Sequence, residues 1–152
     1  MTIGEVTPHL FLGPAPLDDG DFQQLENLKI TAIFSVENPE EGTGDAIDSE
    51  RKAAIRSGMR FENLPVTDFD RPELARKLPE CVQTLEALLV RGETLYLHCT
   101  AGVNRSPTVA VAYLYWVQKW PLAKALAHVR GCRNCVPDRE AIRMASWTRS
   151  IP

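Results

Sequence analysis

A short apolar strand followed by a loop and an apolar helix is the pattern that most constrains this chain. Residues 95–97 predict a buried strand, and residues 107–117 predict a helix that is apolar on nearly every side. A helix without a polar face must be covered by protein all round. We therefore expect residues 107–117 in the middle of the domain, with the loop 98–106 leading into it.

The remaining sequence alternates short apolar runs with helical periodicity, which is typical of α/β proteins. The apolar runs predict strands over residues 9–12, 31–36 and 60–66, and the helical stretches predict a short helix from residue 18 and helices over 46–57, 74–89, 121–129 and 137–147. The sequence has no internal repeat and no interdomain linker. Its 152 residues predict one domain, spanning 1–152, with helices packed around a sheet.

Charge is distributed unevenly along the chain, although the net charge is only −3. Residues 1–80 carry 16 acidic and 8 basic side chains, whereas residues 81–152 carry 4 and 9. The bases of the second half are spaced rather than clustered, which argues against a nucleic-acid partner. They are candidates for a basic rim that attracts an anionic substrate, the five being Lys124, Arg130, Arg133, Arg139 and Arg143.

Two expectations concern location and metal binding. No stretch approaches the roughly 18 apolar residues of a membrane span, and no basic-plus-apolar leader opens the sequence. We expect no membrane partner and a cytoplasmic location, with an organelle as the alternative if a transit peptide has been removed. Cys132 and Cys135 form a single Cys-x-x-Cys pair without a second pair, so no metal site is expected.

The loop 98–106 lies where phosphate binding is physically favoured, between a strand and the start of a helix. Successive backbone N–H groups of a tight loop point inward, and the helix N-terminus adds partial positive charge. Gly102 permits backbone conformations closed to other residues, and Arg105 can donate two hydrogen bonds to phosphate oxygens. The predicted phosphate-binding residues are Thr100, Ala101, Gly102, Val103, Asn104 and Arg105.

Cys99 lies at the base of this loop. A thiol near a helix N-terminus or a cation loses its proton readily, so we expect a thiolate that attacks phosphorus and forms a phosphocysteine intermediate. The leaving oxygen needs a proton from a general acid, and Asp68 and Asp70 are the candidates, near the end of the predicted strand 60–66. The alternatives are a packed cysteine with an incidental surface arginine, and solvated carboxylates at both aspartates.

The sequence Cys-x5-Arg-Ser at residues 99–106, preceded by His98 and a strand, resembles the signature of the cysteine-dependent protein tyrosine phosphatase superfamily. The short chain resembles its dual-specificity branch. The resemblance implies an α/β fold with a small mixed central β-sheet, a phosphorylated protein as substrate and no cofactor. We expect a monomer.

The resemblance also implies roles for individual side chains. Asp68 lies in a Pro-Val-x-Asp pattern, 31 positions before Cys99, and would be the general acid, with Asp70 as the second choice. Ser106 would hydrogen-bond the sulfur, with a helix N-cap as its alternative role. His98 would order the loop from its base.

A closer similarity, to the plant glucan phosphatases, covers roughly residues 62–146. It rests on residues 68–70, 98–102, 135–137 and 141–143. In that group aromatic side chains stack on sugar rings, and Phe69 matches one such position, where a hydrophobic anchor for the loop is the alternative. Those enzymes generally have Gly-Arg where this chain has Asn104-Arg105.

Three functions are compatible with the sequence. The first is a dual-specificity phosphatase acting on phosphotyrosine or phosphoserine/threonine in proteins. The second is a phosphatase of phosphorylated glucan or another non-protein ester, and the third is a module that binds phosphate without turnover. A low-molecular-weight phosphatase is excluded, because its acid follows its cysteine in the chain, whereas Asp68 precedes Cys99.

Overall fold

A mixed five-stranded sheet forms the centre of the computed structural model, which describes residues 1–41 and 44–148. Its strands are β1 (Gly4–Thr7), β2 (Leu10–Gly13), β3 (Ala32–Ser35), β4 (Arg60–Asn63) and β5 (Leu95–His98). They lie in the order β1-β2-β5-β3-β4. Only β1 runs antiparallel to its neighbour, and the other pairs are parallel. The predicted α/β fold with a mixed central sheet is confirmed.

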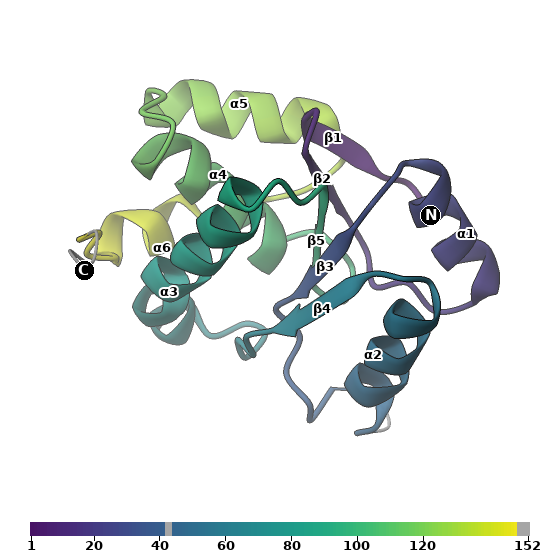
Figure 1. Cartoon of the computed structure of the whole chain (residues 1–152). Coiled ribbons are helices and arrows are strands. Elements are labelled where there is room, and N and C mark those ends of the chain that lie inside the picture. The colour runs from purple at the N-terminus through teal and green to yellow at the C-terminus, as the bar shows by residue number, and fades with distance from the viewer. Residues whose placement is uncertain (42–43, 149–152) are drawn as a thin grey trace.

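Six helices in the described residues cover the two faces of the sheet. They are α1 (Asp19–Asn27), α2 (Ala46–Arg56), α3 (Arg71–Val90), α4 (Arg105–Trp116), α5 (Leu122–Cys132) and α6 (Arg139–Met144). Helices α3 to α6 lie on one side, and α1 and α2 lie on the other (Figure 1). No helix in the described ranges has both the length and the apolar composition needed to cross a bilayer.

The sheet separates two hydrophobic cores, and alternate residues of each inner strand face opposite cores. In β5, Leu95 and Leu97 join the larger core under α3 to α6. Tyr96, between them, joins the smaller core with Phe22 and Leu25 of α1. Because both faces are covered, β5 is buried along its whole length.

Helix α4 is the buried helix that the sequence predicts. Every residue of it is buried except Tyr115, which is 37% exposed. The helix begins earlier than expected, at Arg105, with Asn104 in the N-cap position. Ser106 therefore lies inside the first turn, and its alternative role as the N-cap is wrong.

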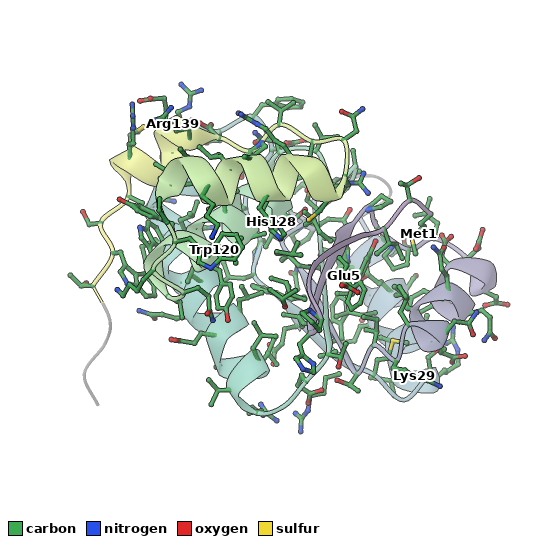
Figure 2. The ribbon with its side chains drawn as sticks, turned by 90° about the horizontal axis from the view of Figure 1, so that it is seen from above. Met1, Glu5, Lys29, Trp120, His128 and Arg139 are labelled. Atoms are coloured by element: carbon green, nitrogen blue, oxygen red, sulfur yellow. The ribbon has the colours of Figure 1, made fainter. Side chains whose placement is uncertain are left out.

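Several element boundaries differ from the sequence-based prediction. Strand β4 ends at Asn63 rather than at residue 66, and α3 begins at Arg71 rather than at residue 74. Strand β1 was not predicted, because Gly4–Thr7 is short and alternates buried with partly exposed residues. His128 of α5 holds this edge strand, because its Nε2 lies 2.7 Å from the Val6 carbonyl oxygen. Figure 2 shows His128 and Trp120 beside α5, where their rings pack edge to face 5.0 Å apart. Helix α6 ends at Met144, three residues before the predicted end.

The parallel strands end at one edge of the sheet. In the register of the sheet, His98 pairs with Gly13 of β2 and with Ser35 of β3. Ser35 in turn pairs with Asn63 of β4. The loops that follow β2, β3, β4 and β5 therefore meet at this carboxyl edge. Open α/β sheets bind ligands at this edge. The predicted site residues belong to these loops or to the start of α4, except His98, which is the last residue of β5.

Candidate active site

The loop after β5 is packed tightly against the loop after β2. Gly102 has φ of +70°, and a Cβ atom there would lie 2.5 Å from the Gly13 carbonyl oxygen. Only glycine combines this left-handed backbone with so close an approach. The conformation predicted for Gly102 from the sequence is therefore present, for two independent steric reasons.

Four consecutive carbonyl groups of the loop accept hydrogen bonds from outside it. The pairs are Thr100 O with Ala15 N (3.0 Å), Ala101 O with Arg133 Nη2 (3.1 Å), Gly102 O with Arg133 Nε (3.1 Å) and Val103 O with Val136 N (2.7 Å). In a planar trans peptide the carbonyl and the next N–H point in opposite directions. The N–H groups of residues 101–104 therefore turn to the inside of the loop, as an anion-binding cradle requires.

Cys99 lies at the bottom of this cradle. It is 3% exposed, and the hydroxyl of Ser106 donates a hydrogen bond to its Sγ at 3.2 Å. Ser106 itself is fully buried in the first turn of α4. The structure thus brings together the predicted nucleophile and the hydroxyl that was expected to bond its sulfur.

Arg105 is the largest charged side chain inside the protein, only 2% exposed. A guanidinium has five N–H donors. Its two terminal nitrogens make four hydrogen bonds. They donate to two oxygens of Glu41 (2.7 Å each), the Val66 carbonyl (2.8 Å) and the Thr100 hydroxyl (3.3 Å). Arg105 Nε is the one buried side-chain nitrogen or oxygen among the described residues without a hydrogen-bond partner. The fifth donor is therefore free for a ligand in the cradle.

Glu41, in the loop after β3, was not identified from the sequence. Its two oxygens bind the two terminal nitrogens of Arg105 side by side, which fixes the plane of the guanidinium. Burial opposes ionisation of this carboxyl, but the hydrogen bonds from Arg105 and Thr100 prevail and lower its pKa to about 2. Glu41 leaves Nε unoccupied, so it orients Arg105 without filling the cradle.

The Thr100 hydroxyl lies between two carboxyl groups, Glu37 (2.9 Å) and Glu41 (2.6 Å). A hydroxyl has one proton and can donate to only one of them. Burial raises the pKa of Glu37, against the opposing charge of His98, whereas the pKa of Glu41 is lowered to about 2. Glu41 also makes the shorter contact, so it is the stronger acceptor for the Thr100 proton.

Replacing Glu41 with glutamine is expected to destabilise the protein at neutral pH by about 1 kcal/mol, the size of a partly screened charge-assisted hydrogen bond. The folded pKa of about 2 lies below the usual 4.5. The contribution is therefore complete above about pH 5 and is lost as the pH falls toward 2. Urea unfolding of both proteins should show a difference at pH 6 that at least halves by pH 3. A difference that stays constant with pH would show that the charge of Glu41 is not responsible.

The two candidate acids occupy different positions. Asp70 caps α3, because its Oδ1 accepts a hydrogen bond from Glu73 N at 3.0 Å. Asp68 faces the cradle instead, with Oδ1 3.3 Å from Arg105 Nε, close enough for an ion pair but without the alignment of a hydrogen bond. Asp68 is also one-third exposed, so it can exchange protons with water. The geometry favours Asp68 over Asp70 as the general acid.

The loop that carries Asp68 is held at its base by Lys77 of α3. Lys77 Nζ donates to the Pro65 carbonyl at 2.6 Å and forms an ion pair with Glu73 at 2.7 Å. The hydrogen bond from Lys77, with others from Thr67, lowers the pKa of Glu73 to about 2. These contacts connect the acid loop to the helix that follows it, so Asp68 is presented from a fixed base.

Replacing Asp68 with alanine is expected to slow turnover by about 10²–10⁴-fold, the usual contribution of a general acid. The loss should be larger for phenyl phosphate than for para-nitrophenyl phosphate, because the more basic phenolate depends more on the donated proton. Steady-state rates on both esters measure it.

Asp70→Ala is the matched control. It removes the α3 cap and should lower the free energy of unfolding by about 1 kcal/mol while turnover stays within threefold. The reverse outcome, with turnover lost only in Asp70→Ala, would transfer the acid role to Asp70.

Phe69 lies between the two aspartates with φ of +58°. This left-handed conformation is unfavourable for an aromatic residue, and it turns the ring outward, where it is 98% exposed. The ring borders a cleft of about 360 Å³ that contains Arg105. The remaining lining residues of the cleft are Thr67, Asp70, Arg71, Leu74, Asn104 and Asp138. An exposed aromatic ring therefore borders a cleft that meets the loop at Asn104 and Arg105.

Behind the loop, His98 is completely buried between two carboxyl groups. Its Nε2 lies 2.5 Å from Oε2 of Glu50, and its Nδ1 lies 2.8 Å from the Cys99 carbonyl oxygen and 3.8 Å from Glu37. Within the described residues, these three side chains are the one group of ionisable residues compact enough to surround a metal ion. Both ring nitrogens already lie within hydrogen-bonding distance of protein atoms.

Comparison with known proteins was made for sequence and for structure. The family model described as the catalytic domain of dual specificity phosphatases matches residues 10–145. Phosphoglucan phosphatase LSF1 of Arabidopsis thaliana is 33% identical over 149 residues, which are 97% of this chain and 25% of that protein. Dual specificity protein phosphatase 22 of Homo sapiens is 31% identical over 133 residues, which are 88% of this chain and 65% of that protein. The chain thus spans between a quarter and two-thirds of these relatives.

Solved structures with the same arrangement include Tk-PTP in its active form and PTPMT1. Tk-PTP superposes with a TM-score of 0.76 at 22% identity, covering 94% of this chain and 92% of that one. PTPMT1 superposes with a TM-score of 0.71 at 20% identity, covering 93% and 90%. At these identities the likeness establishes a shared fold.

Proposed function

This chain belongs to the dual-specificity phosphatase family, and from that premise we propose that it hydrolyses phosphate monoesters of proteins through a phosphocysteine on Cys99. The observation that carries the proposal is the Nε of buried Arg105, which lacks a hydrogen-bond partner and lies beside a cradle of inward N–H groups. A phosphoryl group supplies the acceptor oxygens that these donors lack. Cys99, the N–H groups of the loop and Asp68 all follow strands that end at the same carboxyl edge of the sheet.

In the first step the Cys99 thiolate attacks phosphorus in line with the ester oxygen. The S–P bond forms as the P–O bond breaks, and Asp68 gives its proton to the leaving oxygen. The N–H groups of residues 101–104 and Arg105 Nε stabilise the charge on the three equatorial oxygens. Glu41 keeps the guanidinium plane in place throughout.

In the second step a water molecule attacks the phosphocysteine. Asp68, now a carboxylate, accepts a proton from that water, the S–P bond breaks, and inorganic phosphate leaves. The hydrogen bond from Ser106 to Sγ supports the sulfur as it departs with the electron pair. Both steps balance without any further reactant.

A second candidate substrate is a phosphorylated glucan. It is favoured by the exposed Phe69 ring at the cleft, since flat aromatic faces pack well against the apolar faces of sugar rings. Two relatives with 33% and 30% identity are phosphoglucan phosphatases. They are much longer than this chain, which spans 25% and 39% of their lengths, so we place a phosphorylated protein first.

A side-by-side assay of three substrates tests this order. Phosphotyrosine peptide, phosphoserine peptide and phosphorylated amylopectin are compared at equal phosphate concentration by release of inorganic phosphate. We expect at least one peptide to be hydrolysed faster than amylopectin. If amylopectin is the best substrate, and Phe69→Ser slows only its hydrolysis and not that of para-nitrophenyl phosphate, the second candidate replaces the first.

A further inference from the structure

We propose that Glu50 is a positioning residue for the reaction: it keeps His98 protonated, so that the ring places a positive charge behind the phosphate-binding loop and holds its first carbonyl group. Glu50 lies on α2, does not line the cleft, and belongs to no motif in the sequence. The effect of Glu50 on turnover rests on the proposed function, whereas its contact with His98 does not depend on that function.

The number of protons at His98 follows from its partners. The Cys99 carbonyl oxygen can only accept, so Nδ1 of His98 must donate to it at 2.8 Å. A single further proton is shared between Nε2 and Glu50, 2.5 Å apart. If it resides on nitrogen, the pair is an imidazolium with a carboxylate, and if on oxygen, both groups are neutral.

The surroundings of His98 favour the imidazolium. Burial alone lowers the pKa of His98, but the charge and hydrogen bond of Glu50, the Cys99 carbonyl and Glu37 together raise it above its usual value. The groups that face the ring are Glu50 from α2, Glu37 after β3, Cys99 after β5 and the ring of Tyr96, whose centroid is 5.7 Å away. None of these is a cation that would oppose a positive charge on the ring.

The pair is neutral overall, and its orientation gives it an electrostatic effect. The positive ring touches the first peptide of the loop, whereas the negative carboxylate lies on the far side, on α2. In a poorly polarisable interior the nearer charge prevails. The thiolate of Cys99 and a bound phosphate are therefore both stabilised by the arrangement.

Stability alone does not account for the pair. Glu50 is 6% exposed and His98 is fully buried. Removing two charges from water offsets most of their attraction, so buried ion pairs often contribute little net stability. Glutamine at position 50 would keep a hydrogen bond to Nε2 without a charge. A carboxylate is needed only if the ring must be protonated.

Nitrogen-15 NMR of the histidine rings in the wild-type protein is the first test. The chain has only three histidines, and the His98→Asn variant identifies the signal of His98. We expect protons on both ring nitrogens of His98 at neutral pH. A ring protonated on Nδ1 alone would overturn the proposal, whether or not any variant folds.

Alkylation of Cys99 is the second test, because it reports on the thiolate without any phosphate substrate. The rate with iodoacetamide is measured by peptide mass spectrometry at about pH 6 and about pH 9, since only the thiolate reacts. We expect the ratio of the two rates to fall by about fivefold in Glu50→Gln, through loss of the nearby charge. Glu50→Asp, which keeps the charge, should restore part of it.

Two comparisons separate this role from a general structural one. Glu26→Gln, an exposed glutamate of α1, is the matched control and should leave the ratio unchanged. In the His98→Asn background, Glu50→Gln should have no further effect, because Glu50 acts through the ring. An unchanged ratio in folded Glu50→Gln would overturn the proposal. Failure of the wild type to hydrolyse phosphate esters would instead overturn the proposed function and leave these results standing.

Discussion

The Cys99→Ser variant is expected to lose hydrolysis of para-nitrophenyl phosphate by about 10⁴-fold or more, because removal of a covalent nucleophile abolishes the main pathway. The serine hydroxyl is far less acidic than a thiol, so it keeps its proton at neutral pH and is a much weaker nucleophile. The change is small in volume and the site stays hydrogen-bonded through Ser106. Melting temperature and affinity for inorganic phosphate should remain close to those of the wild type.

Cys132→Ser is the matched control for that experiment. Cys132 is a half-buried thiol at the end of α5, and its Sγ hydrogen-bonds the Glu5 carbonyl oxygen. Its replacement should leave turnover within twofold. Phosphate hydrolysis that persists in Cys99→Ser would remove the phosphocysteine mechanism. Phosphate binding without turnover in the wild type would make the domain a binding module.

Arg105→Lys is expected to lower kcat/KM by about 10³-fold, the effect of losing one or two donors aimed at the transition state. A lysine ammonium is a point charge and cannot bind Glu41 side by side while donating to a phosphate. The Nε donor is lost, and the Val66 carbonyl and Glu41 compete for the ammonium. Both a higher KM and a lower kcat should follow.

The control for Arg105→Lys is Arg91→Lys, an exposed arginine at the end of α3. It should leave both kinetic constants unchanged. Circular dichroism and urea unfolding establish whether Arg105→Lys folds. A folded Arg105→Lys protein with kcat/KM within tenfold of the wild type would show that the guanidinium does not bind the phosphoryl group.

The strand, loop and buried helix of residues 95–117 could be predicted because their signals are local. An apolar run, a glycine and an all-apolar helix each restrict the backbone where they stand. The loop that carries Cys99, between the strand and the buried helix, was predicted for this reason. The Pro-Val-x-Asp pattern already ranks Asp68 before Asp70. The structure adds the contacts of each: Asp70 caps α3, whereas Asp68 lies 3.3 Å from Arg105 Nε.

The acidic residues behind the loop could not be predicted. Glu37, Glu41 and Glu50 lie in a stretch that is typical of a solvated loop and a weak helix. Nothing in the spacing indicates that Glu37 and Glu50 are buried. They meet the site only because β3 lies beside β5 in the sheet. Pairing across 48 positions, as between Glu50 and His98, depends on strand order, which periodicity does not give.

Three of the five basic side chains expected to form a rim have contacts within the protein. Arg133 lies behind the loop, where it binds two backbone carbonyls. Arg143 pairs with Glu140, and Lys124 lies over the ring of Trp120. A count of charges along the sequence does not identify the atoms that each base contacts.

The left-handed backbone at Phe69 has a consequence for how this protein would change under selection. A non-glycine residue in this conformation costs about 1 kcal/mol or more, so glycine or asparagine at position 69 would make the fold more stable. Selection for heat resistance alone would therefore be expected to discard the ring. Selection for activity on the native substrate would be expected to keep the ring if the ring contacts that substrate. The residue found at position 69 after laboratory evolution would therefore distinguish selection for stability from selection for activity.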